Sequence, residues 1–212
     1  MIEANQLYKT YSIVEKELGL KGSIKAFFHP KKKQIHAVQN ISLTVQKGEI
    51  VGYIGSNGSG KSTTIKMLTG VLYPDRGSVK INGLTPQKHR TAVNKQIGVL
   101  FGQKSHLRWD IPVLESFILH AKIYDVPDKV FEERLEQLID LLQLGDFIHQ
   151  PVRNLSLGQR VRCEFAAIFI HQPAVVFLDE PTIGLDASVK ETIRSFIGFM
   201  NMEHQTTFLI TS

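Results

Sequence analysis

Strand-length and helix-length stretches of apolar residues alternate along the chain. The short apolar runs predict strands, at residues 2–8, 37–45, 49–54, 78–82, 96–101, 175–179 and 206–211. Apolar residues spaced three or four apart predict helices at residues 62–68, 113–144 and 188–201. This alternation is typical of an α/β fold with a mostly parallel sheet. The uninterrupted apolar run at 175–178 is expected of a central parallel strand.

An excursion separates the first two predicted strands. Residues 12–34 are rich in lysine, so we expect an inserted, basic, partly helical segment there. Its densest run, Lys31-Lys32-Lys33, could contact anionic lipid or nucleic acid, but a solvated loop is the simpler interpretation.

A glycine-rich turn joins the strand at 49–54, which we expect to be buried, to the helix at 62–68. Its residues fit the phosphate-binding pattern G-x-x-x-x-G-K-[ST]: Gly55, Ser56, Asn57, Gly58, Ser59, Gly60, Lys61, Ser62 and Thr63. The glycines let backbone N–H groups point inward, and a helix N-terminus favours an anion. Lys61 supplies a charge for the β- and γ-phosphates, and the hydroxyl of Ser62 is placed to bind Mg²⁺. A non-functional turn is the alternative, which the strand–loop–helix context disfavours.

Two carboxylates end the predicted central strand. Asp179 and Glu180 follow the apolar run at 175–178. Ligands of open α/β sheets bind at the carboxyl ends of the strands. We therefore predict that Asp179 holds Mg²⁺ opposite Ser62, and that Glu180 polarises a water for attack on the γ-phosphate.

Length, charge and cysteine content narrow the class of protein. The chain has 212 residues, a net charge of +5 and one cysteine, Cys163. One cysteine excludes an internal disulfide, and its apolar helical surroundings predict a buried thiol rather than a nucleophile. No apolar run approaches the roughly 18 residues of a membrane span, and the first residues lack the layout of a signal peptide. We therefore expect a soluble, cytoplasmic protein.

A third motif, Leu155-Ser156-Leu157-Gly158-Gln159, precedes the acidic strand. It resembles the Leu-Ser-Gly-Gly-Gln signature of ABC-type ATPases, with Leu157 in place of the first glycine. The resemblance implies that Ser156, Gly158 and Gln159 cap a γ-phosphate held by the P-loop of a second ATPase domain. A serine that only caps a helix is the simpler alternative, and Ser156 can serve both roles.

Other elements of the ABC-type ATPases follow in the family order. Gln103 resembles the Q-loop glutamine, which reaches Mg²⁺ and the attacking water. Residues 181–186 resemble the D-loop of the dimer interface. Tyr11 resembles the aromatic residue that stacks on adenine, with Phe27 and Phe28 as alternatives.

The resemblance also implies the domain organisation. We expect a single ABC-type ATPase domain over residues 1–212, with a P-loop NTPase core at 1–112 and 162–212. An antiparallel β subdomain and an inserted helical subdomain at about 113–161 would complete it. The family's switch histidine normally follows the strand matched by residues 208–212, so we expect the C-terminal part of the family fold to be missing and this chain to be weakly active.

The residues around Gln103 suggest a direction of transport. Residues 101–113 and the excursion resemble bacterial ABC-2-type ATPases, which generally serve export and pair with separate membrane-spanning subunits. Trp109 either lines the groove that receives a permease helix or packs the helical subdomain; the sequence favours neither.

Together the motifs and the resemblance imply an ATP-binding and ATP-hydrolysing subunit of an ABC transporter, with export as the expected direction. Its cofactors would be ATP and Mg²⁺, with Glu180 and Gln103 catalytic and Ser62, Gln103 and Asp179 at the metal. Its partners would be integral-membrane permease subunits and a second ATPase subunit, identical or different. We expect no nucleic acid, and a peripheral location on the inner face of the membrane through the permease.

Two other functions remain as alternatives. A soluble ABC-type ATPase could act on nucleic acid or ribosomes, although no sustained heptads for a long coiled coil and no second ATPase domain occur in the sequence. A degenerate subunit could bind nucleotide without turnover, but Lys61, Asp179 and Glu180 argue against it.

Overall fold

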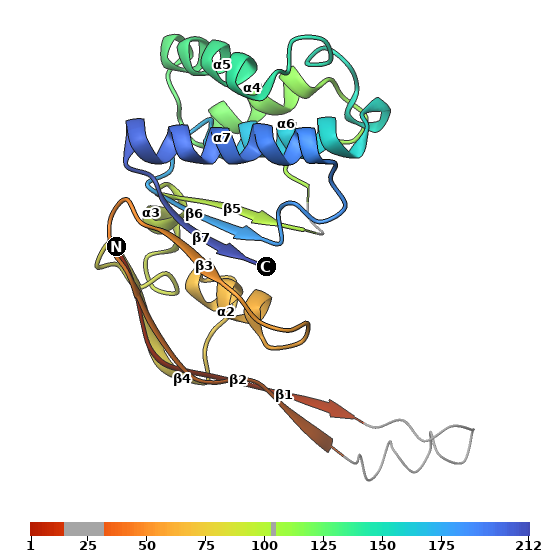
Figure 1. Ribbon diagram of the computed structural model, residues 1–212. Helices are drawn as coiled ribbons and strands as arrows, with labels where there is room; N and C mark the ends of the chain where they lie inside the picture. The colour runs from red at the N-terminus through yellow and green to blue at the C-terminus, as the bar shows by residue number, and fades with distance from the viewer. Residues whose placement is uncertain (15–31, 103–104) are drawn as a thin grey trace, which may run out of the picture.

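Two β-sheets and a layer of helices make up the molecule (Figure 1). The computed structural model describes residues 1–14, 32–102 and 105–212. The strands are β1 Ile2–Val14, β2 Lys32–Val45, β3 Ile50–Tyr53, β4 Arg76–Ile81, β5 Ile97–Phe101, β6 Val175–Asp179 and β7 Thr207–Thr211. The helices are α2 Lys61–Leu68, α3 Arg90–Asn94, α4 Val113–Ile123, α5 Asp128–Leu142, the 3₁₀ turn η1 Val152–Asn154, α6 Leu157–Phe169 and α7 Ala187–His204.

The parallel sheet has the strand order β3-β7-β6-β5. Every residue of β6 is buried, as its apolar run predicts for a central strand. Helices α4, α5, α6 and α7 cover one face of this sheet (Figure 1). Their apolar faces pack with β5, β6 and β7 into one core, in which Phe165, Phe169 and Phe196 are fully buried and meet edge to face.

The antiparallel sheet has the order β2-β1-β4. Helix α2 contacts β2, β4 and β6, so it lies between the two sheets (Figure 1). A second core surrounds it, with Ile65, Met67 and Leu68 of α2 fully buried. Because α2 packs against both sheets, its N-terminus is held at the carboxyl ends of the parallel strands.

The α/β class and the antiparallel β sheet are confirmed, and two local predictions are wrong. The strands β1 and β2 continue to Val14 and start at Lys32, so residues 12–14 and 32–34 are paired strand rather than excursion. The rest of the excursion, including Phe27 and Phe28, lies outside the described residues. Strand β3 is not buried: it is an edge strand, and Ile50 is 47% exposed.

The helices follow the predicted periodicity. The apolar pattern over 113–144 forms two helices: α4 ends at Ile123, and Pro127 is the N-cap of α5. Cys163 is fully buried in α6, and burial raises the pKa of its thiol to about 12, which confirms a core thiol. Among the described residues, every helix is too short or too polar to cross a bilayer.

Candidate nucleotide-binding site

The glycine-rich turn runs from the end of β3 into the N-terminus of α2. Gly60 is the N-cap of α2 and has a φ of 90°, in the left-handed region. A Cβ there would lie 2.1 Å from the carbonyl oxygen of Ala37, so only glycine fits against β2. The N–H group of Ser59 donates to Ser56 O at 3.1 Å and closes the turn. The first N–H groups of α2 have no partner inside the helix, and they face the loop as donors for an anion.

Lys61 is the buried cation of this loop. Its side chain is only 6% exposed, and its Nζ donates to the carbonyl oxygens of Gly55 at 2.5 Å and Ser56 at 3.4 Å. The same Nζ lies 3.7 Å from Oε1 of Glu180. A buried ammonium needs such oxygen partners, and phosphate oxygens can take their place. The P-loop and the end of β6 are therefore joined through Lys61.

The two carboxylates occupy different environments at the end of β6. Asp179 is 8% exposed, and its Oδ1 accepts a hydrogen bond of 2.8 Å from the hydroxyl of Thr211. The side chain of Glu180 is 33% exposed. Glu180 has a φ of 53°, a left-handed conformation that costs a residue other than glycine roughly 1–2 kcal/mol. Backbone strain of this kind persists where the surroundings enforce it, often at functional sites.

The available ligands suit Mg²⁺. Ser62 begins α2 beside Lys61, and Asp179 ends β6; both offer hard oxygen atoms. The described residues contain no cluster of three or more His, Cys, Asp or Glu side chains that could hold a metal by themselves. Mg²⁺ is commonly held by one or two side chains together with substrate phosphates and water. The chemistry of this pair of side chains therefore fits the ion.

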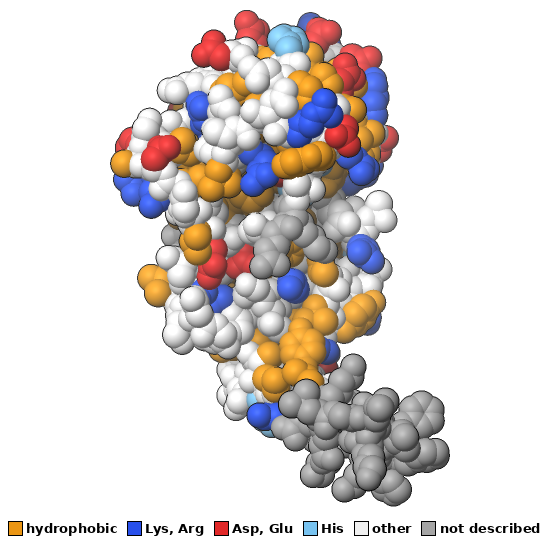
Figure 2. Space-filling view, turned by 90° about the vertical axis from the view of Figure 1, so that its right-hand side faces the viewer, with side chains coloured by type: hydrophobic (Ala, Val, Ile, Leu, Met, Phe, Trp, Pro, Cys, Tyr) orange, Lys and Arg blue, Asp and Glu red, His pale blue; other side chains and the backbone are white. Residues whose placement is uncertain are grey.

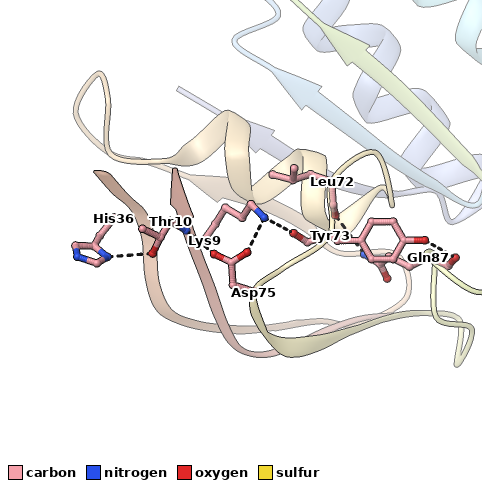
Figure 3. Close-up of polar contacts among 7 residues, drawn as sticks. All are labelled: Lys9, Thr10, His36, Leu72, Tyr73, Asp75 and Gln87. Carbon is pink, nitrogen blue, oxygen red and sulfur yellow. Dashed lines mark hydrogen bonds and ion pairs between the residues drawn. The ribbon is translucent and has the colours of Figure 1, made fainter. Parts of the chain in front are cut away.

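The strand that carries Tyr11 is fixed by a polar cluster (Figure 3). Asp75 accepts from Lys9 Nζ and from the backbone N–H of Thr10, both at 2.7 Å, which lowers the pKa of its carboxyl. The hydroxyl of Thr10 lies 3.0 Å from Nδ1 of His36 on the paired strand. Tyr11 itself lies opposite Ile35 and is 39% exposed. The ring of Tyr11 is thus partly exposed on a strand that these bonds hold in place, and no hydrogen bond of the described residues joins it to the P-loop.

The signature motif forms the N-terminus of α6. Ser156 is the N-cap, and its Oγ accepts from the N–H of Gln159 at 3.2 Å. In return, the side-chain oxygen of Gln159 accepts from the N–H of Ser156 at 2.8 Å, which completes a capping box. The helix-capping role of Ser156 is therefore confirmed. Leu157 is 46% exposed, and its Cδ2 would lie 3.6 Å from a Cβ at Gly184, so its side chain turns toward the D-loop segment of its own chain.

The structure brings some predicted site residues together and leaves others apart. The P-loop, Asp179 and Glu180 converge at one edge of the parallel sheet. Ser156, Gly158 and Gln159 lie in the helical layer, and no hydrogen bond or ion pair of the described residues links them to the P-loop. Gln103 lies outside the described residues.

Two residues that follow Gln103 are hydrogen-bonded to α6, the helix that begins in the signature motif. The N–H group of His106 donates to Glu164 at 2.9 Å, and the hydroxyl of Ser105 donates to the same carboxylate. Glu164 is 6% exposed and lies in α6. Sequence reasoning missed both Glu164 and Thr211. Neither residue belongs to a local sequence motif, and both reach the site through tertiary structure. Thr211, for example, lies opposite Asp179 because β6 and β7 pair.

Two sequence comparisons identify proteins that resemble this chain. The family profile described as "ABC transporter" matches residues 38–183. The ABC transporter ATP-binding protein NatA of Bacillus subtilis is 34% identical over 179 residues, which cover 84% of this chain and 73% of NatA.

Two solved structures share the fold. A dimeric post-hydrolysis state of the ATP-binding cassette MJ0796, bound to ADP and Pi, matches with a TM-score of 0.80 at 23% identity. The match covers 100% of this chain and 88% of that one. An ATP-binding subunit of an ABC transporter matches with a TM-score of 0.81 at 23% identity, covering 99% of this chain and 78% of that one. The chain therefore belongs to the ABC transporter family of ATP-binding proteins and is an ATPase of that family.

Proposed function

We propose that the chain powers an ABC exporter by binding and hydrolysing Mg·ATP. The observation that carries the proposal is the position of Lys61, which lies buried between the P-loop carbonyl groups and Glu180. A cation held in this place, at the N-terminus of a clamped helix, has the charge and the donors that a triphosphate needs.

The residues of the site divide the chemistry among them. Lys61 and the first N–H groups of α2 bind the β- and γ-phosphates, and Ser62 and Asp179 hold Mg²⁺. When bound there, Mg²⁺ would supply a positive charge that offsets the negative charge of the phosphates. Glu180 accepts a hydrogen bond from the attacking water and orients it, with Gln103 as a second group for this water. Tyr11 stacks on the adenine ring.

The remaining predicted residues act on a second subunit. Within the described residues, Ser156, Gly158 and Gln159 make no hydrogen bond to their own P-loop. By their resemblance to the ABC signature, we assign them to capping the γ-phosphate of a partner in a head-to-tail dimer. The N-terminus of α6 supplies a favourable dipole for that phosphate. The capping box holds Ser156 at the tip of α6 and supports this role.

The helical layer is the natural place for communication with a membrane partner. We assign residues of about 113–161 to a helical subdomain, which would contact an integral-membrane permease and hold the ATPase at the inner face of the membrane. Trp109 is 54% exposed, and the guanidinium of Arg160 lies 5.9 Å from its ring. This exposure supports a role for Trp109 in contact with a partner. The direction, export, rests on the resemblance of residues 101–113 to ABC-2-type ATPases.

The described side chains on one face of the molecule give less support to a function on nucleic acid. On the face that Figure 2 shows, acidic and basic side chains mingle over the helical layer and form no continuous basic stripe. Nucleic-acid binding generally needs such a basic surface.

Purification of the tagged chain from detergent-solubilised membranes of its own cells tests the proposal. A polytopic membrane protein that co-purifies, and stimulates ATP hydrolysis, supports a transporter subunit. Recovery with ribosomes or nucleic acid, and not with membranes, would instead support the alternative. Active transport into everted membrane vesicles supports export, and uptake into right-side-out vesicles contradicts it.

A further inference from the structure

Thr211 lies between the two halves of the candidate site. It ends β7, the strand between β3, which leads into the P-loop, and β6, which ends in Asp179 (Figure 1). In the parallel register, Thr211 is opposite Tyr53 on one side and Asp179 on the other. Its side chain is 1% exposed, so its hydroxyl must find partners inside the protein.

The hydroxyl of Thr211 bonds to both acidic residues at once. It donates to Oδ1 of Asp179 at 2.8 Å and accepts from the backbone N–H of Glu180 at 3.0 Å. A hydroxyl has one hydrogen, and an N–H group can only donate. The hydrogen of Thr211 is therefore committed to Asp179, and the direction of both bonds is fixed.

The first bond orients the carboxylate of Asp179. With Oδ1 engaged by Thr211, rotation of the carboxylate about its side-chain bond is restricted. Oδ2 makes no other hydrogen bond among the described residues, which leaves it as the oxygen for a metal or for water bound to a metal. Removing a partner that orients a metal-binding side chain commonly lowers metal affinity or activity by about 10- to 100-fold.

The second bond fixes the backbone of Glu180. This residue has a φ of 53°, and in this conformation its side chain comes within 3.7 Å of Lys61. A residue in the left-handed region readily relaxes toward extended or helical conformations unless its surroundings hold it. The N–H group of Glu180 is held by Thr211, so the same hydroxyl keeps the side chain of Glu180 directed at the P-loop.

We propose that Thr211 is a positioning residue, whose single hydroxyl sets both the metal-binding carboxylate of Asp179 and the conformation of Glu180. The inference rests on the proposed function, because it takes Asp179 and Glu180 as the metal ligand and the base. It gives β7, the strand next to β6, a role in the site. It also makes the hydroxyl of Thr211, rather than the shape of its side chain, the functional group.

Two matched pairs of side chains test this. Threonine and valine have nearly the same shape and differ by the hydroxyl; serine and alanine differ in the same way at a smaller size. ATP affinity is measured in EDTA and in Mg²⁺ by fluorescence titration, and kcat and KM are measured by phosphate release. Thr211→Val should leave ATP affinity in EDTA within 3-fold, weaken the gain in affinity from Mg²⁺ by about 10- to 100-fold, and lower kcat by about 10- to 100-fold.

The hydroxyl should be sufficient on its own. Thr211→Ser should retain the Mg²⁺ gain and kcat within about 3-fold, although loss of its buried methyl group lowers the melting temperature. Thr211→Ala should lose both. Equal behaviour of threonine and valine, or of serine and alanine, would overturn the inference; if Thr211→Val does not fold, the serine–alanine pair decides. Asp179→Asn is the control: if it leaves the Mg²⁺ gain intact, the proposed site itself is wrong, independently of Thr211.

Discussion

Nζ of Lys61 lies 3.7 Å from Oε1 of Glu180, so the proposed phosphate-binding cation and the proposed base form an ion pair across the site. Without a phosphate, this pairing offsets part of the cost of burying the ammonium. A bound triphosphate would draw Lys61 away from Glu180 and leave the carboxylate to a water molecule. We therefore expect the two residues to link nucleotide binding to the release of the proposed base.

Replacing Lys61 tests the first half of this link. Lys61→Ala should weaken ATP binding by at least about 100-fold, because charge-assisted hydrogen bonds contribute roughly 1.5–3 kcal/mol each. Titration with a fluorescent ATP analogue measures the change. Lys66→Ala is the matched control, because Lys66 is an exposed lysine of the same helix. The Lys66→Ala protein should bind ATP with normal affinity. Unchanged affinity in Lys61→Ala would sink the assignment of the P-loop.

Replacing Glu180 tests the second half. Glu180→Gln keeps the size of the side chain, removes the base and breaks the ion pair with Lys61. It should bind ATP at least as tightly as the wild-type chain, hydrolyse it at least about 100-fold more slowly, and accumulate as an ATP-bound dimer. Size-exclusion chromatography with and without Mg·ATP shows the dimer. A monomer at saturating Mg·ATP and high protein concentration contradicts the head-to-tail mechanism.

Local sequence was enough to predict the parts of the site that one segment of chain builds. The P-loop at Gly55–Thr63 and the acidic end of β6 each combine a motif with a strand, and both lie where these patterns place them. The N-cap role of Ser156 was likewise predicted, from a serine that opens a helix, and the capping box with Gln159 came from the structure.

The rest depended on pairing between distant segments. Thr211 reaches Asp179 across 32 residues of sequence, and Ser105 reaches Glu164 across 59. No periodicity marks such a contact before the sheet order is known. The exposure of Ile50 was missed for the same reason, because an apolar strand at a sheet edge resembles a central one in sequence.

The role of Tyr11 can be separated from phosphate binding. Tyr11→Ala should weaken ATP binding by about 5- to 100-fold if stacking on the base contributes roughly 1–3 kcal/mol. It should leave the affinity for inorganic tripolyphosphate unchanged, because that ligand has no base. Competition titration against a fluorescent nucleotide measures both affinities. Tyr73→Ala is the control, because it removes another exposed tyrosine near Asp75. If Tyr11→Ala loses affinity equally for both ligands, the substitution has damaged the strand rather than removed a stacking contact.

Burial of His171 predicts a pH dependence of stability. Its ring stacks on Tyr124 with centroids 3.9 Å apart, its Nε2 lies 3.0 Å from Ile97 O, and burial lowers its pKa from 6.5 to about 4. Between these values the unfolded chain binds more protons than the folded one, so stability should fall as the pH drops from 6.5 toward 4 and level off below it. The shift corresponds to about 3 kcal/mol.

Denaturant unfolding at pH 7 and pH 5 measures this effect. The wild-type chain should lose more free energy of unfolding between these two pH values than His171→Gln, which keeps a hydrogen-bond donor but does not titrate. Burial also lowers the pKa of His120, so the variant should retain part of the dependence. An identical pH dependence in both proteins would contradict the assignment to His171.

Leu157 replaces a family glycine, and its conformation predicts that the replacement does not block the signature. Its side chain turns toward Gly184 of its own chain, and Ser156 beside it is exposed, so we expect a partner to reach the backbone there. Leu157→Gly should therefore lower stability by about 1 kcal/mol, through helix propensity, and leave ATP-driven dimerisation of the Glu180→Gln protein within about 3-fold. Ser156→Ala should cost a similar amount of stability through loss of its cap. It should also weaken the dimer, because it removes the proposed donor to the γ-phosphate. Analytical ultracentrifugation with Mg·ATP compares the two variants at matched folded concentrations. A dimer at least 10-fold tighter in Leu157→Gly would show that the leucine obstructs the γ-phosphate after all.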